Sequence, residues 1–146
     1  MKRHPCLQPL SREHHLGLVL SRRAASLADD DAAGIAEHWQ ALTDYLTTQI
    51  PAHFATEKEC IADVIFAKLP SDEAVRLANE MLKQHNEIEA LLQISAPTAA
   101  DVRKLAQALH DHIRFEEREV FPVAQAVLDN NELQALYAAS SDAAKK

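Results

Sequence analysis

The sequence is poor in glycine and in aromatic residues, and both shortages favour helices. It has two glycines in 146 residues and 5% aromatic residues, whereas alanine, leucine, glutamate and glutamine, which favour helix over strand, are abundant. With 47% hydrophobic residues, the chain is long enough to bury a core without disulfides. The composition therefore predicts an all-α protein, and we expect one domain over residues 1–146.

Cysteine, clustered basic charge and long apolar runs are also scarce. Cys6 and Cys60 are the only cysteines, so the sequence has neither a disulfide framework nor a C-x-x-C metal motif. A formal charge of −7 without a basic stripe disfavours nucleic acid and anionic membranes as partners. No apolar run approaches the roughly 20 residues that cross a bilayer, and none follows the basic N-terminus. We expect a soluble, cytoplasmic protein that binds neither nucleic acid nor membrane.

Start and stop signals in the first half of the chain predict two long helices. The first runs from about residue 9, with Ser11 as its N-cap, to the acidic stretch 29–31, and Gly34 marks the break after it. The second runs over about 35–68 and bends at Pro51, because proline removes a helical hydrogen bond.

The second half predicts two more long helices and a short one. The third begins after Ser71 as N-cap and reaches about residue 94. The fourth begins after Thr98, in a near capping-box arrangement, and reaches about residue 129. A short helix over about 132–139 follows. Long helices with short connections pack as antiparallel neighbours, so we expect an up-down-up-down four-helix bundle over about 10–129.

A histidine and a glutamate lie four residues apart in the fourth helix, within LHDHIRFEEREVFP. That spacing stacks His112 and Glu116 one turn apart on one face. A buried charge without a partner is costly, but imidazole and carboxylate are metal ligands, so a divalent ion removes that cost. The same face carries apolar residues, which places the pair in the interior: Leu105, Leu109, Val120 and Val123.

The second helix repeats this arrangement in IPAHFATEKECI. His53 and Glu57 are again four residues apart on an apolar face. Two such pairs on separate helices indicate a shared site. The apolar residues of this face are Leu46, Ile50, Ile61 and Val64.

The third and first helices each add a histidine. In MLKQHNEIEALL, His85 lies on an apolar stripe and Glu89 follows one turn later. In EHHLGLVL, His14 falls on the inner face and His15 points toward the side of Arg22. We therefore favour His14 as the first-helix ligand. The residues that share its face are Leu10, Gly17, Ser21, Ala25 and Ala28.

Each feature has a simpler interpretation when it is taken alone. A single H-x-x-x-E is commonly a surface pair, and a lone core histidine is usually hydrogen-bonded. These interpretations together describe a metal-free interaction bundle. They would have to hold independently on four helices, so the pattern favours a metal site. We expect three further polar residues, His110, Glu117 and Glu119, to be exposed or to contact the ligands from outside.

The pattern resembles the hemerythrin-like family, also called the HHE cation-binding domain, over nearly the whole chain. The matching segments are EHH at 13–15, HFATE at 53–57, QHNEIE at 84–89 and HIRFEEREVFP at 112–122, and the last accounts for Pro122. The resemblance implies a di-iron centre, two Fe ions with an oxo or hydroxo bridge, in which two carboxylates bridge the metals. The implied ligands are His14, His53, Glu57, His85, His112 and Glu116.

The chain departs from the oxygen-carrying hemerythrins. Their third helix supplies two histidines four residues apart, where this chain has Glu89, and their last bridging carboxylate is an aspartate at a longer spacing. The pattern is closer to bacterial relatives linked to iron and nitrosative stress. Glu89 as an extra ligand, and His15 in place of His14, both stay open at this stage.

These implications lead to two hypotheses besides the metal-free bundle. In the first, a non-haem di-iron protein binds or reacts with O₂ or NO, or senses iron and oxygen status. In the second, a storage or regulatory module holds Zn or Mn without redox chemistry. The sequence contains no nucleophile or acid-base pair beyond the ligands, so it predicts no organic substrate and leaves open whether the protein is an enzyme.

Overall fold

The computed structural model describes residues 2–144, and over these residues the chain is helical with no β-strand. A 3₁₀ turn, η1 (Pro5–Leu7), precedes four long helical runs, of which the second and fourth are each divided by a single π-turn. The runs and the final helix are α1 (Gln8–Ala25); α2 (Ala32–Thr48), α3 (Ile50–Glu57), η2 (Lys58–Ala62) and α4 (Asp63–Lys68); α5 (Asp72–Leu91); α6 (Ala99–Phe115), η3 (Glu116–Val120) and α7 (Phe121–Val127); and α8 (Asn130–Ala144).

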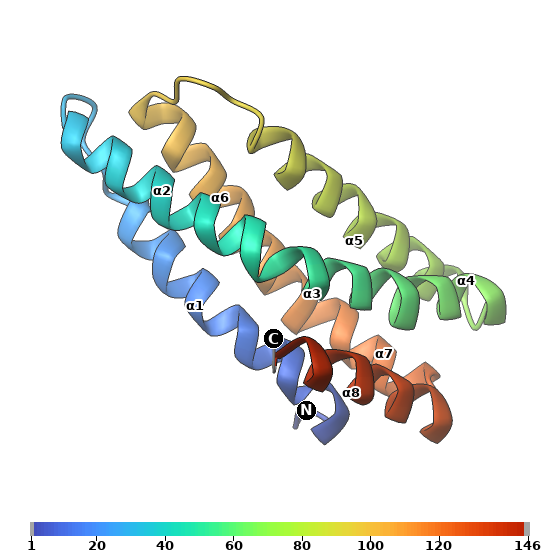
Figure 1. Ribbon diagram of the computed structural model, residues 1–146. Coiled ribbons are helices and arrows are strands. Elements are labelled where there is room, and N and C mark those ends of the chain that lie inside the picture. The colour runs from blue at the N-terminus through green and yellow to red at the C-terminus, as the bar shows by residue number, and fades with distance from the viewer. Residues whose placement is uncertain (1, 145–146) are drawn as a thin grey trace.

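The four runs form an antiparallel bundle, as expected (Figure 1). Helix α1 packs along α6 and against α2, and α5 packs against α6 and the π-turns. Helix α8 folds back across the end of the bundle and contacts η1, α1 and α3, so both ends of the described chain lie at the same side. No helix in this part of the chain is long and apolar enough to span a membrane.

Two of the predicted N-caps are confirmed, whereas a third N-cap and the predicted break between the first two helices are wrong. The hydroxyls of Ser71 and Thr98 accept the backbone N–H groups three residues on, and Thr98 completes a capping box. Ser11 is not an N-cap, because α1 has already begun at Gln8 and the Ser11 hydroxyl instead donates to a glutamate of the fourth run. Gly34 is not the break; its N–H donates to the Asp31 carboxylate that caps α2.

Several expected boundaries differ from the structure. The first run ends at Ala25, before the acidic stretch 29–31, and the third ends at Leu91 rather than at about residue 94. The second run begins at residue 32 and is interrupted at Gln49, beside Pro51, which lacks the N–H needed to continue the helical ladder. The final helix covers 130–144 rather than 132–139, because Asp129 and the Glu132 side chain each accept the other's backbone N–H at its start. The fourth run ends at residue 127.

The π-turns begin at, or directly after, the two glutamates that follow the site histidines. In η2, directly after Glu57, the Asp63 N–H donates to the carbonyl of Lys58, five residues earlier. In η3, which starts at Glu116, the Phe121 N–H donates to the Glu116 carbonyl. Such a turn takes one more residue than an α-turn, and single π-turns occur frequently at functional sites.

The extra residue changes which side chains downstream face the core. Val64 and Val123 were expected there, but both are only half-buried. The next residues, Ile65 and Ala124, are buried instead. Each shift equals one residue, as an inserted residue in the preceding turn requires.

At the C-terminal end of α1, the residue that faces the core also differs from the expected one. Ala25 is exposed and lines a surface recess with Ser21, while Ala24 is buried. Ala24 belongs to the apolar cluster that contains Leu27 and Leu42, so the turn into α2 covers this side of the helix.

The apolar core consists of two clusters. One surrounds Leu10, Met81 and Phe121 and includes Leu133 and Leu136 of α8. The other surrounds Leu42, Tyr45, Leu105 and Ile113 near the opposite end. The predicted metal ligands lie between the two clusters, so the bundle holds its polar centre between two apolar layers.

Leu69 gives a stability prediction because its backbone is left-handed. It has φ 49° and ψ 54°, its N–H donates to the Ile65 carbonyl, and its side chain is 68% exposed. Glycine adopts this conformation without the Cβ penalty. We expect Leu69→Gly to stabilise the fold by about 1 kcal/mol in denaturant unfolding. Leu69→Ala, which keeps the Cβ, is the control; equal stability of the two variants would contradict this account.

Gly17 gives the opposite prediction. A Cβ there would lie 2.7 Å from both Ile113 Cδ1 and the Tyr45 hydroxyl, which donates to the Glu13 carbonyl at 2.8 Å. We expect Gly17→Ala to destabilise the protein by about 2 kcal/mol, because overpacking and a lost buried hydrogen bond outweigh the gain in helix propensity. In a Tyr45→Phe background the same substitution should cost less, and an unchanged cost would exclude the steric explanation.

Candidate metal centre

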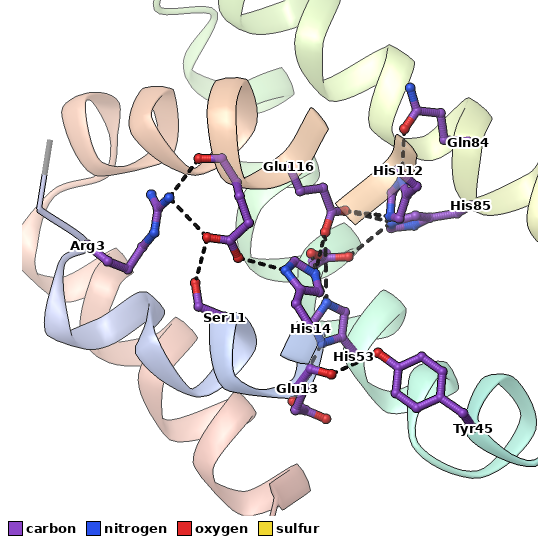
Figure 2. A network of polar contacts seen from close by, with 12 residues as sticks. Arg3, Ser11, Glu13, His14, Tyr45, His53, Gln84, His85, His112 and Glu116 are labelled. Atoms are coloured by element: carbon purple, nitrogen blue, oxygen red, sulfur yellow. Dashed lines mark hydrogen bonds and ion pairs between the residues drawn. The ribbon is translucent and has the colours of Figure 1, made fainter. Parts of the chain in front are cut away.

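The structure brings the six side chains that the sequence singled out into the middle of the bundle. They come from α1, α3, α5, α6 and the first residue of η3, and they are between 0% and 4% exposed. Figure 2 shows the four histidines and Glu116 together with polar residues around them, among which Gln84 and Glu13 approach imidazole rings from outside. The six are His14, His53, Glu57, His85, His112 and Glu116.

One half of the centre combines α1 and α3. The Nε2 atom of His14 lies 2.9 Å from Glu116 Oε1, and Nε2 of His53 lies 3.1 Å from Glu57 Oε2. His53 Nε2 is also 3.9 Å from Glu116 Oε1. This half therefore presents two nitrogens and two carboxylate oxygens.

The other half combines α5 and α6. The Nε2 atom of His112 lies 2.9 Å from Glu116 Oε2, and Nε2 of His85 lies 3.0 Å from Glu57 Oε1 and 3.2 Å from Glu116 Oε2. Each carboxylate thus turns one oxygen toward each half. Among the described residues, these are two groups of four donors, each within 4.8 Å, that share both glutamates.

Several of these atoms have no hydrogen-bond partner although they are buried. They include Nε2 of His14, His53 and His112 and both carboxylate oxygens of Glu57. Close approach without hydrogen-bond alignment is the arrangement expected of donors that converge on a common ion. Imidazole and carboxylate donors suit divalent first-row metals, so the residues fit a pair of such ions.

Two histidines donate a hydrogen bond from their outer nitrogen to an oxygen, and a third has a carboxylate nearby without a hydrogen bond. His14 Nδ1 lies 2.7 Å from Glu117 Oε2, and because a carboxylate only accepts, the imidazole donates there and keeps Nε2 free for an ion. His112 Nδ1 likewise donates to the Gln84 side-chain carbonyl at 2.8 Å. His53 Nδ1 is 3.5 Å from Glu13 Oε1. Such contacts orient metal-binding imidazoles.

Two residues near the N-terminus, Arg3 and Ser11, both labelled in Figure 2, hold Glu117 in place. Arg3 donates to the Glu117 carboxylate at 3.1 Å and to its backbone carbonyl at 2.7 Å, and the Ser11 hydroxyl donates to the same carboxylate at 3.2 Å. Burial alone would raise the pKa of Glu117, but contacts with His14, Ser11 and Arg3 outweigh it and lower the pKa.

Without metal, the central groups shift one another's protonation. Burial lowers the pKa of His85, but the carboxylates of Glu116 and Glu57 more than compensate and raise it to about 9. The pKa values of His14 and His53 are raised by the same competition. Burial opposes the ionised form of Glu116, yet the surrounding imidazoles hold its pKa well below the ordinary value. In the metal-free protein, protons therefore balance the buried carboxylates.

Comparison with known proteins identifies the family. The family model for the hemerythrin HHE cation binding domain matches residues 9–124. The chain belongs to this family. We found no match to the chain among curated proteins or among solved structures. The matched segment contains all six central residues, so the HHE family assignment and the geometry concern the same site.

The structure also shows where the alternative ligands, His15 and Glu89, lie. His15 is exposed on α1, so His14 is the histidine of that helix that reaches the centre. Glu89 is exposed and lies outside both groups of donors. Glu119 is exposed and His110 is partly exposed, while Glu117 contacts His14 from outside, as expected for such residues.

Sequence reasoning missed Gln84 and Glu13 as outer partners. Both lie directly before a central histidine in the sequence, yet Gln84 contacts His112 and Glu13 contacts His53, each on a different helix. Spacing along one helix does not reveal a contact across helices. The available signal was that a polar residue next to an inward-facing histidine borders the interface with the adjacent helix.

These pKa shifts predict how pH affects the metal-free protein. A histidine with a raised pKa stabilises the fold fully below its unfolded pKa of about 6.5, and this contribution is lost as pH rises through about 9 for His85. Glu116, with a lowered pKa, contributes above about 4.5 and loses its contribution as pH falls below that value. The melting temperature in EDTA should therefore be highest between about pH 4.5 and 6.5.

A divalent ion should reverse the alkaline trend, because it requires neutral imidazoles and releases their protons on binding. The gain in melting temperature on adding metal should thus grow from pH 6 to pH 8. The check is a series of thermal melts with EDTA and with metal at each pH. A metal-induced gain that shrinks as pH rises would contradict this coupling.

Proposed function

We propose that this chain is a non-haem di-iron protein that binds or reacts with a small diatomic molecule, O₂ or NO. The observation that supports it most directly is the pair of four-donor groups joined by Glu57 and Glu116. A pair of iron ions would supply reversible ligand binding and electron-transfer chemistry.

Donor number supports an open site. Each group offers two imidazole nitrogens and two carboxylate oxygens, whereas iron commonly takes six ligands, so two positions per ion are left for small ligands. No other buried acid-base pair accompanies the site in the described chain, and this agrees with a small ligand rather than an organic substrate.

The protein's own residues would fix the donors and limit the access of water. Glu117 and Gln84 orient two of the imidazoles from outside. Phe54 stacks on His85 with ring centroids 3.7 Å apart, and Phe121 stacks on His14 at 5.5 Å. These rings cover both sides of the centre with apolar surface, which keeps the region dry around the donors.

Composition and spectroscopy of the purified protein test this proposal. We expect about two iron ions per chain after aerobic purification from iron-supplied cells, with a ferric absorption band that disappears on reduction and a new band when the reduced protein meets NO. Colourless protein that contains zinc would favour the non-redox alternative, a divalent metal-binding module in storage or regulation. Protein without any metal would favour the metal-free bundle.

Neighbouring histidines on α1 supply the matched variants. His14→Ala should lower the iron content to one ion or fewer per chain, because it removes a buried donor whose Nε2 faces Glu116. His15→Ala, one residue along on the exposed side, should retain two. Circular dichroism of both variants checks that they fold. Equal iron content in His14→Ala and His15→Ala would refute the site assignment.

A further inference from the structure

We infer that the two halves of the centre are not equivalent: the half with His14 and His53 holds its ion tightly, and the half with His85 and His112 holds the weaker, exchangeable ion. This inference rests on the proposed function. Two independent observations carry it, namely the charge of the outer partners and the position of a surface recess.

The outer partners of the His14 half are carboxylates. Glu117 accepts from His14, and Glu13 lies 3.5 Å from His53 with its Oε1 atom buried and without a hydrogen-bond partner. A carboxylate that accepts from the outer nitrogen, as Glu117 does from His14, makes an imidazole a stronger donor, and a carboxylate nearby, such as Glu13, stabilises a cation through its negative charge. Arg3 and Ser11 keep the Glu117 carboxylate in this position.

The outer partner of the His112 half is neutral. His112 donates to the Gln84 amide oxygen, which carries no formal charge. His85 is stacked face to face on Phe54, with an interplanar angle of 7°, and its Nε2 atom points to the shared carboxylates. The two halves therefore offer the same donor atoms with unequal electrostatic support.

Access differs in the same direction. A recess of about 360 Å³ between α3 and α5 reaches His85 from the surface, and exposed residues form its mouth. Phe54 forms the inner wall of this recess. At the other half, Phe121 stacks on His14 and the Arg3 guanidinium lies 5.3 Å from the centroid of that ring, so these two side chains cover this face of His14. The mouth of the recess is lined by Pro51, Ala55, Lys58, Asn86 and Glu89.

Titration of the metal-free protein with Co²⁺ tests the assignment of the halves. Two bound cations repel each other, so the second binds more weakly even in a symmetric site, and unequal affinities alone do not support the inference. Variants identify the halves instead. Glu117→Gln keeps the shape of the side chain and removes its charge, and we expect it to weaken the first binding event by about 10- to 100-fold while the second changes little.

The reciprocal variant is Gln84→Glu, which places a carboxylate on His112. It should strengthen the second event and narrow the gap between the two. The inference is overturned if Glu117→Gln weakens the second event and spares the first, or if neither variant changes the ratio of the two affinities.

The rate at which a chelator removes cobalt tests the recess. We expect Phe54→Leu to speed the loss of the weakly held ion several-fold, because it removes the ring that stacks on His85 where the recess reaches this histidine. Phe121→Leu, the matched change at the His14 half, should leave that rate unchanged. Thermal melts verify that both variants remain folded, and faster loss of the tightly held ion alone in Phe54→Leu would overturn the inference.

The failure of this inference differs from the failure of the proposed function. If two ions bind but neither Glu117→Gln nor Gln84→Glu changes the ratio of their affinities, the inequality of the halves is overturned. That result still agrees with a two-metal centre. A chain that binds no cobalt overturns both.

Discussion

Six ionisable side chains are buried at the centre of this bundle, and the rest of the structure accommodates that burial. Isolated charges in such surroundings are costly unless opposite charge meets them. Here four imidazoles surround two carboxylates, so either protons or divalent ions can provide the positive charge. Protons and metal compete for the same nitrogen atoms, and the two apolar clusters on either side supply the packing that the polar centre lacks.

The π-turns show how one helical run can both present ligands to the polar centre and pack in the apolar core. Each begins at or directly after a shared glutamate, at the point where the run changes from presenting ligands to packing in the apolar cluster that includes Leu133 and Leu136 of α8. An added residue rotates the following side chains, so Ile65 and Ala124 reach the apolar cluster. Regular α-helices would turn Val64 and Val123 inward instead, as the period of 3.6 residues requires.

Much of the site could be predicted from the sequence, because its information is local. The spacing of four residues placed His53 with Glu57 and His112 with Glu116, and helical phase separated His14 from His15. The caps at Ser71 and Thr98 were predictable for the same reason. The π-turns, the Ser11 contact and the partners Gln84 and Glu13 were not, since each depends on which helices lie next to one another.

The site has residues inside the segment that matches the family and residues just outside it. All six candidate ligands lie within residues 9–124, but Arg3 lies before that segment and Gln125 directly after it. Arg3 donates to Gln125 at 3.0 Å and to Glu117, and Glu117 in turn receives the His14 hydrogen bond. The two flanking residues thus contact each other directly, and Arg3 also holds the carboxylate that contacts His14 from outside. An outer contact sets the orientation and donor strength of its imidazole. Arg3, outside the family segment, therefore acts on the His14 half through Glu117, although it supplies no donor atom.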